Sequence, residues 1–180
     1  RYLYKDCACF EGMTFAFGHL IGAWILGKIY EKVKSKKLSH VTWGFLLLGS
    51  ILPDADFVID WVIGTNLHRT FSHSFLFVIV TGLLVFFIAK YFTKEHKEIG
   101  IAIAAGIMMH LFLDYFSVLG VALFWPYQLY FSPFGNMYQP VLNGLTFGSL
   151  EELKLSVKLA VVDMGLGTLW IGYLWFRKRI

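Results

Sequence analysis

Long apolar blocks separated by short lysine-rich segments dominate the pattern of this chain. Each block is close to the ~20 residues that an α-helix needs to cross the hydrocarbon core of a bilayer. Because backbone groups inside a bilayer must be hydrogen-bonded within their own segment, the blocks predict helices. The predicted spans cover residues 13–30, 41–63, 74–92, 99–119 and 159–176. The pattern therefore predicts an all-α membrane protein, a bundle of about five transmembrane helices in one domain.

Three segments depart from the simple pattern of spans and loops. Within the second span, Pro53 stands among apolar residues, and we expect it to kink the helix because it lacks a backbone N–H. Residues 1–12 carry no apolar block, and we interpret them as a tail or an expression remnant ahead of a single membrane domain, 13–180. The segment 120–158 is rich in aromatic residues and predicts an outer loop on the membrane surface.

Composition and charge favour a membrane over nucleic acid as the partner. The chain is 57% hydrophobic and 16% charged, whereas soluble domains are about 25% charged. Its net charge of +4 comes with no basic stripe of interleaved aromatic residues, which argues against nucleic-acid binding. Most basic residues fall on one side of the predicted spans: Lys28, Lys32, Lys34, Lys36, Lys37, Lys90, Lys94, Lys97, Arg177, Lys178 and Arg179. The positive-inside rule then places the amino end outside the cell membrane and the carboxyl end in the cytoplasm.

Ionisable residues in and beside the spans gather in the opposite half, nearer the outer surface. They are His19, Asp54, Asp56, His68, Arg69, His73, His110 and Asp114. His19, for example, lies about 9 Å along the first span when that span is entered from outside. Ionisable side chains at membrane depth are costly and usually functional. Their gathering at one depth predicts a single site that faces the outer leaflet.

The types and spacing of these residues favour a divalent metal ion. His110 and Asp114 are four residues apart, so both point to one face of a helix. Mixed imidazole and carboxylate ligands suit zinc, and also manganese or iron. For His19 alone, a hydrogen-bonded interior residue is the simpler interpretation. Ser72 and Ser74 are interpreted as a helix N-cap and as donors that support the ligands.

A series of short motifs follows the same order along the chain. The motifs are Gly18-His19, Leu52-Pro53-Asp54-Ala55-Asp56, His68-Arg69-Thr70-Phe71-Ser72-His73-Ser74, His110-Leu111-Phe112-Leu113-Asp114 and Trp125-Pro126. Over about residues 13–127, this series resembles the YdjM-like family of membrane-bound metal-dependent hydrolases. More loosely, the order of the ligands is similar to that of zinc-dependent phospholipase C, an all-helical enzyme.

The resemblance implies a membrane hydrolase that binds one or two divalent ions, with zinc expected first. The implied ligands are His19, Asp54, Asp56, His68, His73, His110 and Asp114. In the expected reaction a metal-activated water attacks a phosphoester, Asp54 or Asp56 orients that water or takes its proton, and Arg69 clamps a phosphate oxygen. A membrane lipid or lipid-like molecule is the expected substrate. Two alternatives stay open: a transporter that binds metal without chemistry, and a non-catalytic membrane protein with a structural metal site or polar residues that only join helices.

Overall fold

Helices make up most of the chain that the structure describes. In the computed structural model, the described residues are 16–56, 62, 70–116, 120–127, 129, 131–133, 165–167, 169–174 and 176–177. The helices are α1 (Ala16–Lys34), α2 (His40–Ile51), η1 (Pro53–Ala55), η2 (Phe71–His73), α4 (Phe75–Lys90) and α5 (His96–Tyr115). Residues 165–167, 169–174 and 176 are helical as well. Within these residues, one isolated bridge between Val121 and Phe131 is the only β-type pairing, so the predicted all-α class is confirmed there.

Serines and a proline define the ends of the helices that carry the site. Ser39 precedes α2 and Ser74 precedes α4, and each side chain accepts a backbone N–H of the first helical turn at 3.2 Å. The predicted N-cap at Ser74 is therefore confirmed. Helix α2 ends at Ile51, two residues before Pro53, and a 3₁₀ turn follows as η1. Pro53 was expected to kink this helix, but because it cannot donate to the carbonyl four residues earlier, the α-helix stops here and a 3₁₀ turn replaces it.

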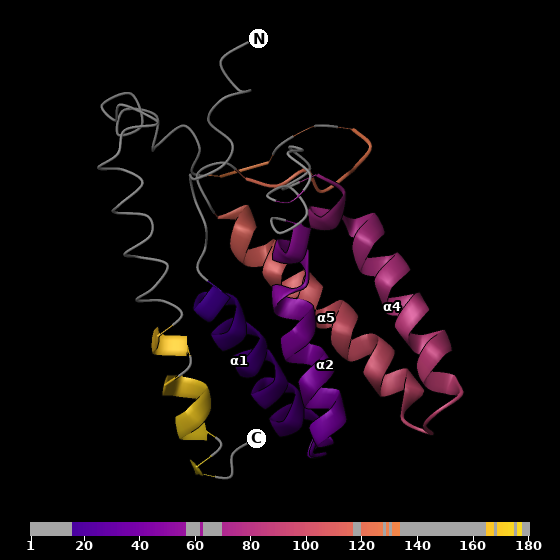
Figure 1. Cartoon of the computed structure of the whole chain (residues 1–180), viewed down its shortest axis with the longest axis vertical. Coiled ribbons are helices and arrows are strands. Elements are labelled where there is room, and N and C mark those ends of the chain that lie inside the picture. Colours follow the sequence, from indigo (N-terminus) through magenta and orange to yellow (C-terminus); the bar gives the residue numbers. More distant parts are fainter. Residues whose placement is uncertain are drawn as a thin grey trace.

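Helix α5 is the centre of the bundle. It packs most extensively against α2 and α4 and also contacts α1 (Figure 1). On one side, Ala102 of α5 belongs to a cluster with Ala23 of α1 and Trp43 of α2. On the other side, Ile103 and its neighbours on α5 pack with Val78 of α4. Residues far apart in the sequence are therefore held around one helix, the helix that carries His110.

Apolar surface covers several of the described helices. Among them, α5 alone combines the length, 20 residues, and the composition that crossing a bilayer requires, while α2 and α4 are apolar but shorter. Helix α4 exposes large apolar side chains such as Ile79, Leu83 and Phe87. A helix that is apolar on every face suits the interior of a large protein or a membrane. The bundle of about five spans stays a prediction.

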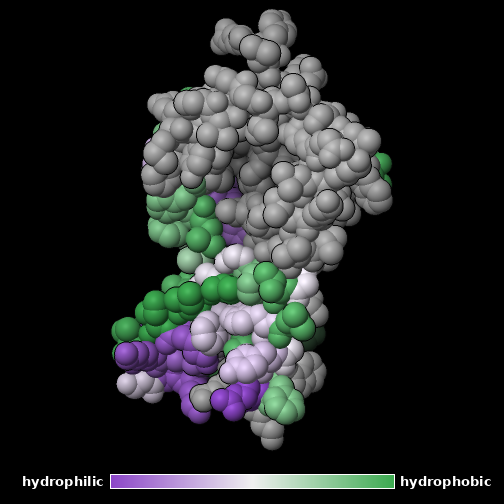
Figure 2. Space-filling model, turned by 90° about the vertical axis from the view of Figure 1, so that its left-hand side faces the viewer, coloured by the Kyte–Doolittle hydropathy of each residue, from purple (hydrophilic) through white to green (hydrophobic). Residues whose placement is uncertain are grey.

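Polar residues lie toward the two opposite ends of the bundle. The last turn of α1 carries Lys32 and Lys34, whereas His19 stands near the start of the same helix. Helix α5 begins at His96 and reaches His110 about four turns later. On the face shown in Figure 2, hydrophilic side chains gather at the lower end, below a hydrophobic belt. We call the end of the bundle that carries Lys32 and Lys34 the lysine-rich end. The opposite end, which carries His19 and His110, is the histidine end.

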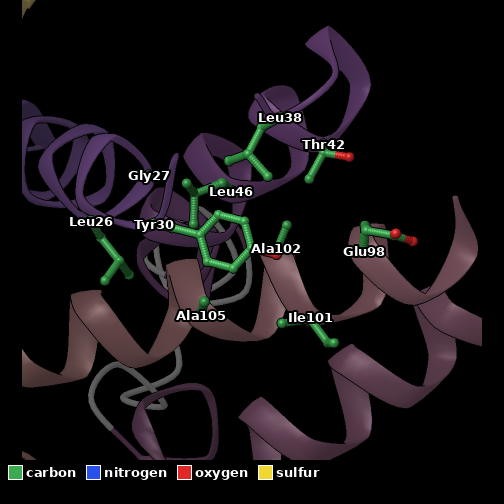
Figure 3. A pocket seen from close by; sticks show the side chains of 10 residues that line it. All are labelled: Leu26, Gly27, Tyr30, Leu38, Thr42, Leu46, Glu98, Ile101, Ala102 and Ala105. Carbon is green, nitrogen blue, oxygen red and sulfur yellow. The ribbon is translucent and has the colours of Figure 1, made fainter. Parts of the chain in front are cut away.

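An apolar pocket of about 160 Å³ lies among α1, α2 and α5 toward the lysine-rich end (Figure 3). Its lining residues are Leu26, Gly27, Tyr30, Leu38, Thr42, Leu46, Glu98, Ile101, Ala102 and Ala105. These are mostly hydrocarbon side chains, and the ionisable residues of the histidine end are not among them. The pocket is therefore separate from the candidate site.

Candidate metal centre

Three segments bring four ionisable side chains together at the histidine end. Asp54 comes from η1, His73 from η2, and His110 and Asp114 from the last turns of α5. The short turns η1 and η2 contact each other, and α2 carries η1 at its end beside α5. His73 and His110 are 0% exposed and Asp114 is 2% exposed, while Asp54 is 31% exposed. Four polar side chains from distant parts of the chain therefore share one largely buried position.

The ligand atoms of this group have the separations that a four-coordinate ion requires. The Nε2 atoms of His73 and His110 are 3.2 Å apart. Asp54 Oδ1 lies 3.6 Å from the first of these nitrogens and 3.4 Å from the second. Asp114 Oδ2 lies 3.4 Å and 3.3 Å from the same two nitrogens. Ligands placed about 2.0–2.1 Å from a zinc ion at the corners of a tetrahedron stand about 3.4 Å apart, which these five separations approach. All four atoms lie within 4.8 Å of one another.

Hydrogen bonds on the far side of both imidazole rings determine which nitrogen faces the group. His110 Nδ1 lies 2.7 Å from the carbonyl oxygen of Ser50, which only accepts, so this nitrogen carries the proton. His73 Nδ1 lies 2.9 Å from Ser72 Oγ. The Ser72 hydroxyl donates its hydrogen to Asp56, so it accepts from His73 Nδ1–H. In each neutral ring the remaining nitrogen, Nε2, therefore presents a lone pair to the group.

The group is consequently a set of four acceptors without a donor among them when the rings are neutral and the carboxylates are ionised. It consists of two imidazole Nε2 atoms and two carboxylate oxygens, all within 4.8 Å of one another. Acceptors this close repel one another, and burial removes the water that would otherwise screen them. A divalent cation relieves the repulsion, and two imidazoles with two carboxylates form a donor set that suits zinc. The described residues can therefore hold a metal ion.

Two further predicted residues border this group. His19 is fully buried, and its Nε2 lies 3.5 Å from Asp114 Oδ1, the carboxylate oxygen on the other side from His73 and His110. Its ring stacks on that of His110 with centroids 3.8 Å apart. Asp56 lies behind His73, with Oδ2 3.6 Å from Nδ1 rather than from Nε2. In this geometry His19 and Asp56 border the four ligand residues and orient them.

The structure accounts for most of the residues that the sequence nominated. It brings Asp54, His73, His110 and Asp114 into one group and places His19 and Asp56 beside it. The predicted supporting role of Ser72 is confirmed by its bonds to Asp56 and His73. His68 and Arg69 lie outside the described residues.

Sequence reasoning missed the carbonyl group of Ser50 and the glycines beside it. A backbone oxygen has no residue signature, so Ser50 carried no signal of its role. The signal that was available is Gly106, a small residue one helical turn before His110. A small residue at that position indicates that another backbone approaches α5 closely there.

Comparison with known proteins agrees with the motif series. A model of the YdjM inner membrane protein family matches residues 13–180. The chain belongs to this family. As a member of the YdjM inner membrane protein family, it is a membrane protein, and the resemblance inferred from the motifs is confirmed.

One relative of this YdjM protein is "Uncharacterized protein YvsG" of Bacillus subtilis (strain 168). The two are 34% identical over 108 residues, which cover 57% of this chain and 62% of that protein. The chain thus matches less than two thirds of the length of this relative. No solved structure matches the chain.

Proposed function

We propose that this YdjM protein is a membrane-embedded, metal-dependent hydrolase that cleaves a phosphoester in a lipid or lipid-like substrate. The observation that carries the proposal is the group of four acceptor atoms from Asp54, His73, His110 and Asp114. His73, His110 and Asp114, whose ligand atoms lie 3.2–3.4 Å apart, can hold one divalent ion with a fourth position open, and Asp54 adjoins that position. Zinc is the expected ion, with manganese or iron as alternatives.

When bound, such an ion supplies Lewis acidity and brings the pKa of a coordinated water toward about 7. The side chains around it supply orientation and proton transfer. Asp54 is 31% exposed, whereas His73 and His110 are fully buried, so Asp54 lies on the side from which water and substrate arrive. We assign Asp54 to orient the attacking water or take its proton, with Asp56 as the alternative.

The surroundings of the group favour a substrate carried by lipid. Aromatic rings pack at the histidine end, with centroids 5.2 Å apart for Phe71 and Trp125 and 5.5 Å apart for Phe75 and Phe124. Aromatic side chains prefer the headgroup zone of a bilayer. The lysines lie at the opposite end, which supports an outer-leaflet site with the amino end outside and the carboxyl end in the cytoplasm. Arg69, two residues before Phe71, is expected to clamp a phosphate oxygen.

The test is to purify the protein in detergent and measure bound metal together with hydrolysis. Metal content is determined by mass spectrometry, and activity is assayed on bis(p-nitrophenyl) phosphate and on phospholipid vesicles, with and without EDTA. We expect stoichiometric metal and hydrolysis that EDTA abolishes and added zinc restores. His110→Ala should lose both, and His96→Ala, at the other end of α5, should retain both.

The remaining outcomes decide between this function and its alternatives. Bound metal without hydrolysis of either substrate would replace the hydrolase with a metal transporter or a structural metal site. A preparation that binds no divalent ion at all would overturn the proposal.

A further inference from the structure

We propose that Gly49 and Gly106 are positioning residues: their backbone contact places His110 and thereby sets how tightly the centre holds its ion. The inference rests on the proposed metal centre. It concerns two residues that touch no ligand atom and act through the helices that carry the ligands.

The two glycines allow α2 and α5 to touch through their backbones. A Cβ atom added to Gly49 would lie 2.4 Å from the carbonyl oxygen of Ile103. A Cβ atom added to Gly106 would lie 2.2 Å from the carbonyl oxygen of Leu46 and 2.9 Å from the backbone nitrogen of Ser50. Since the obstructing atoms are backbone, no rotamer change can relieve such a clash. Any side chain at either position must push the helices apart.

This contact lies directly beside the hydrogen bond that orients His110. Gly106 precedes His110 by one helical turn, and Gly49 is the neighbour of Ser50. The Ser50 carbonyl accepts from His110 Nδ1 at 2.7 Å, across the same pair of helices. N–H···O bonds weaken beyond about 3.2 Å, so a shift of α5 by much less than the width of a methyl group breaks this bond. The ring then loses the partner that holds Nε2 toward the other ligands.

The end of α2 just before Pro53 leaves the Ser50 carbonyl available for this purpose. The last four carbonyls of an α-helix have no partner within the helix, and α2 ends at Ile51. Beyond it the chain turns as a 3₁₀ segment, in which the Ala55 N–H donates to Leu52 only three residues back. The proline that carries Asp54 toward the group thus also leaves a helix-end carbonyl to orient His110.

A second glycine contact on α5 provides a matched control. A Cβ atom added to Gly100 would lie 2.8 Å from Cβ of Phe86 and 3.1 Å from the carbonyl oxygen of Gly82, both on α4. Gly100 precedes His110 by about 15 Å of helix and has no ligand beside it. An alanine at either position crowds α5 against a neighbouring helix, but only the one at position 106 crowds it beside the centre.

The experiment compares Gly106→Ala and Gly100→Ala in the full-length protein in detergent. Cobalt(II) serves as the probe, because its visible spectrum reports the geometry of its ligands as well as its affinity. We expect Gly106→Ala to weaken cobalt binding by about 10–100-fold, the range seen when a partner that orients a ligand is lost, and to change the spectrum. Gly100→Ala should lower the thermal midpoint while it leaves affinity and spectrum as in the wild type. Wild-type cobalt binding in Gly106→Ala, or equal weakening in both variants, would overturn the inference.

Pro53→Ala keeps the question decidable if Gly106→Ala does not accumulate. This substitution adds no bulk and restores an N–H that can donate to Gly49, and a continued α-helix would bring the next N–H, that of Asp54, to the Ser50 carbonyl. Because the change also moves Asp54, the deciding measurement is the tautomer of His110: a mixed tautomer supports the inference, and a fully protonated Nδ1 as in the wild type would contradict it.

Nitrogen-15 NMR of the histidines in metal-free protein separates this inference from the proposed function. It should show protonated Nδ1 at His110 in the wild type and in Gly100→Ala, and a mixed tautomer in Gly106→Ala. If the wild type binds no metal, the proposed function fails. The tautomers would then still decide whether the glycine contact orients His110.

Discussion

The two ends of the bundle each hold carboxylates near nitrogen atoms, yet the chemistry of the two ends differs. At the lysine-rich end, three groups donate hydrogen bonds to the Glu31 carboxylate. The Leu38 N–H lies 3.0 Å away, the Trp43 indole N–H 3.1 Å and Lys28 Nζ 3.0 Å. At the histidine end, Asp114 Oδ2 instead faces the two Nε2 atoms of the site at 3.3–3.4 Å, and these nitrogens are acceptors in neutral rings.

The difference separates a structural carboxylate from one that belongs to a possible metal site. Burial alone would raise the pKa of Glu31, but the hydrogen bonds from Leu38, Lys28 and Trp43 outweigh it and hold the pKa below its ordinary value. Glu31 thus links the end of α1 to Leu38, in the loop before α2, and to Trp43 of α2. The carboxylates of the histidine end face imidazole nitrogens instead, and together with them they form a group that could hold a metal ion. Residue types alone do not distinguish the two cases, whereas the direction of each hydrogen bond does.

The largest expected effect comes from removal of one acceptor of the histidine end. His110→Ala deletes a ligand atom and should weaken zinc or cobalt binding by at least about 100-fold. Titration calorimetry of the detergent-solubilised protein measures this. Glu31→Ala is the matched change at the lysine-rich end and should leave metal affinity unchanged. Equal loss of affinity in both variants would show that the two ends are not chemically distinct.

The next effect is on the stability that a bound ion adds. At a zinc concentration of about 100 times Kd, binding should add about 2.7 kcal/mol to the free energy of unfolding. Thermal melts with zinc and with EDTA measure the difference as a shift in midpoint. For a 100-fold weaker site, His110→Ala should gain at most about 0.4 kcal/mol from the same zinc concentration. A zinc-dependent shift in His110→Ala as large as that of the wild type would place the bound ion elsewhere.

A smaller effect should follow from loss of the hydroxyl that orients His73. Ser72→Ala removes the acceptor of the Nδ1–H and should weaken metal binding by about tenfold, with an altered cobalt spectrum. Ser72→Thr keeps a hydroxyl and should restore binding. If both variants bind cobalt as the wild type does, Ser72 contributes packing alone.

The smallest effect is expected at the lysine-rich end. Glu31→Gln keeps the shape of the side chain but loses its charge, and should cost about 1 kcal/mol of stability at pH 7 without change in metal affinity. Because the pKa of Glu31 is lowered from the ordinary 4.5 in the folded protein, its contribution is present above about that pH and is lost as pH falls below it. Melts of the two proteins at pH 7 and in mild acid should therefore converge in acid. A difference in stability between the two proteins that grows in acid would contradict this expected direction.

Much of the helical framework could be predicted from the sequence. Apolar block length predicted the helices over residues 16–34, 75–90 and 96–115 to within a few residues. Pro53 predicted a kink within the second span, where the structure instead ends α2 at Ile51. The boundaries differ because a helix need not end where its apolar block ends: the helix that carries His110 already begins at His96 and includes the charged residues Lys97 and Glu98.

The site could be predicted only in part. Spacing predicted that His110 and Asp114 share a face, and the motifs nominated Asp54 and His73. The different positions of Asp54 and Asp56 could not be predicted, because both flank the same helix break. Only the 3₁₀ turn directs one carboxylate to the Nε2 atoms and the other to Ser72. The part played by Ser50 depends on a main-chain oxygen, which no side-chain pattern reveals.

The exposed position of Asp54 has a consequence for the rate at which an ion enters and leaves. Asp114 is 2% exposed and both histidines are fully buried, so Asp54 is the only one of the four residues with a substantial surface. An ion held by this group would leave past the exposed Asp54 side chain. Movement of this one aspartate would then set the residence time of the ion, and a compact chelator should remove the ion faster than a bulky one of equal affinity.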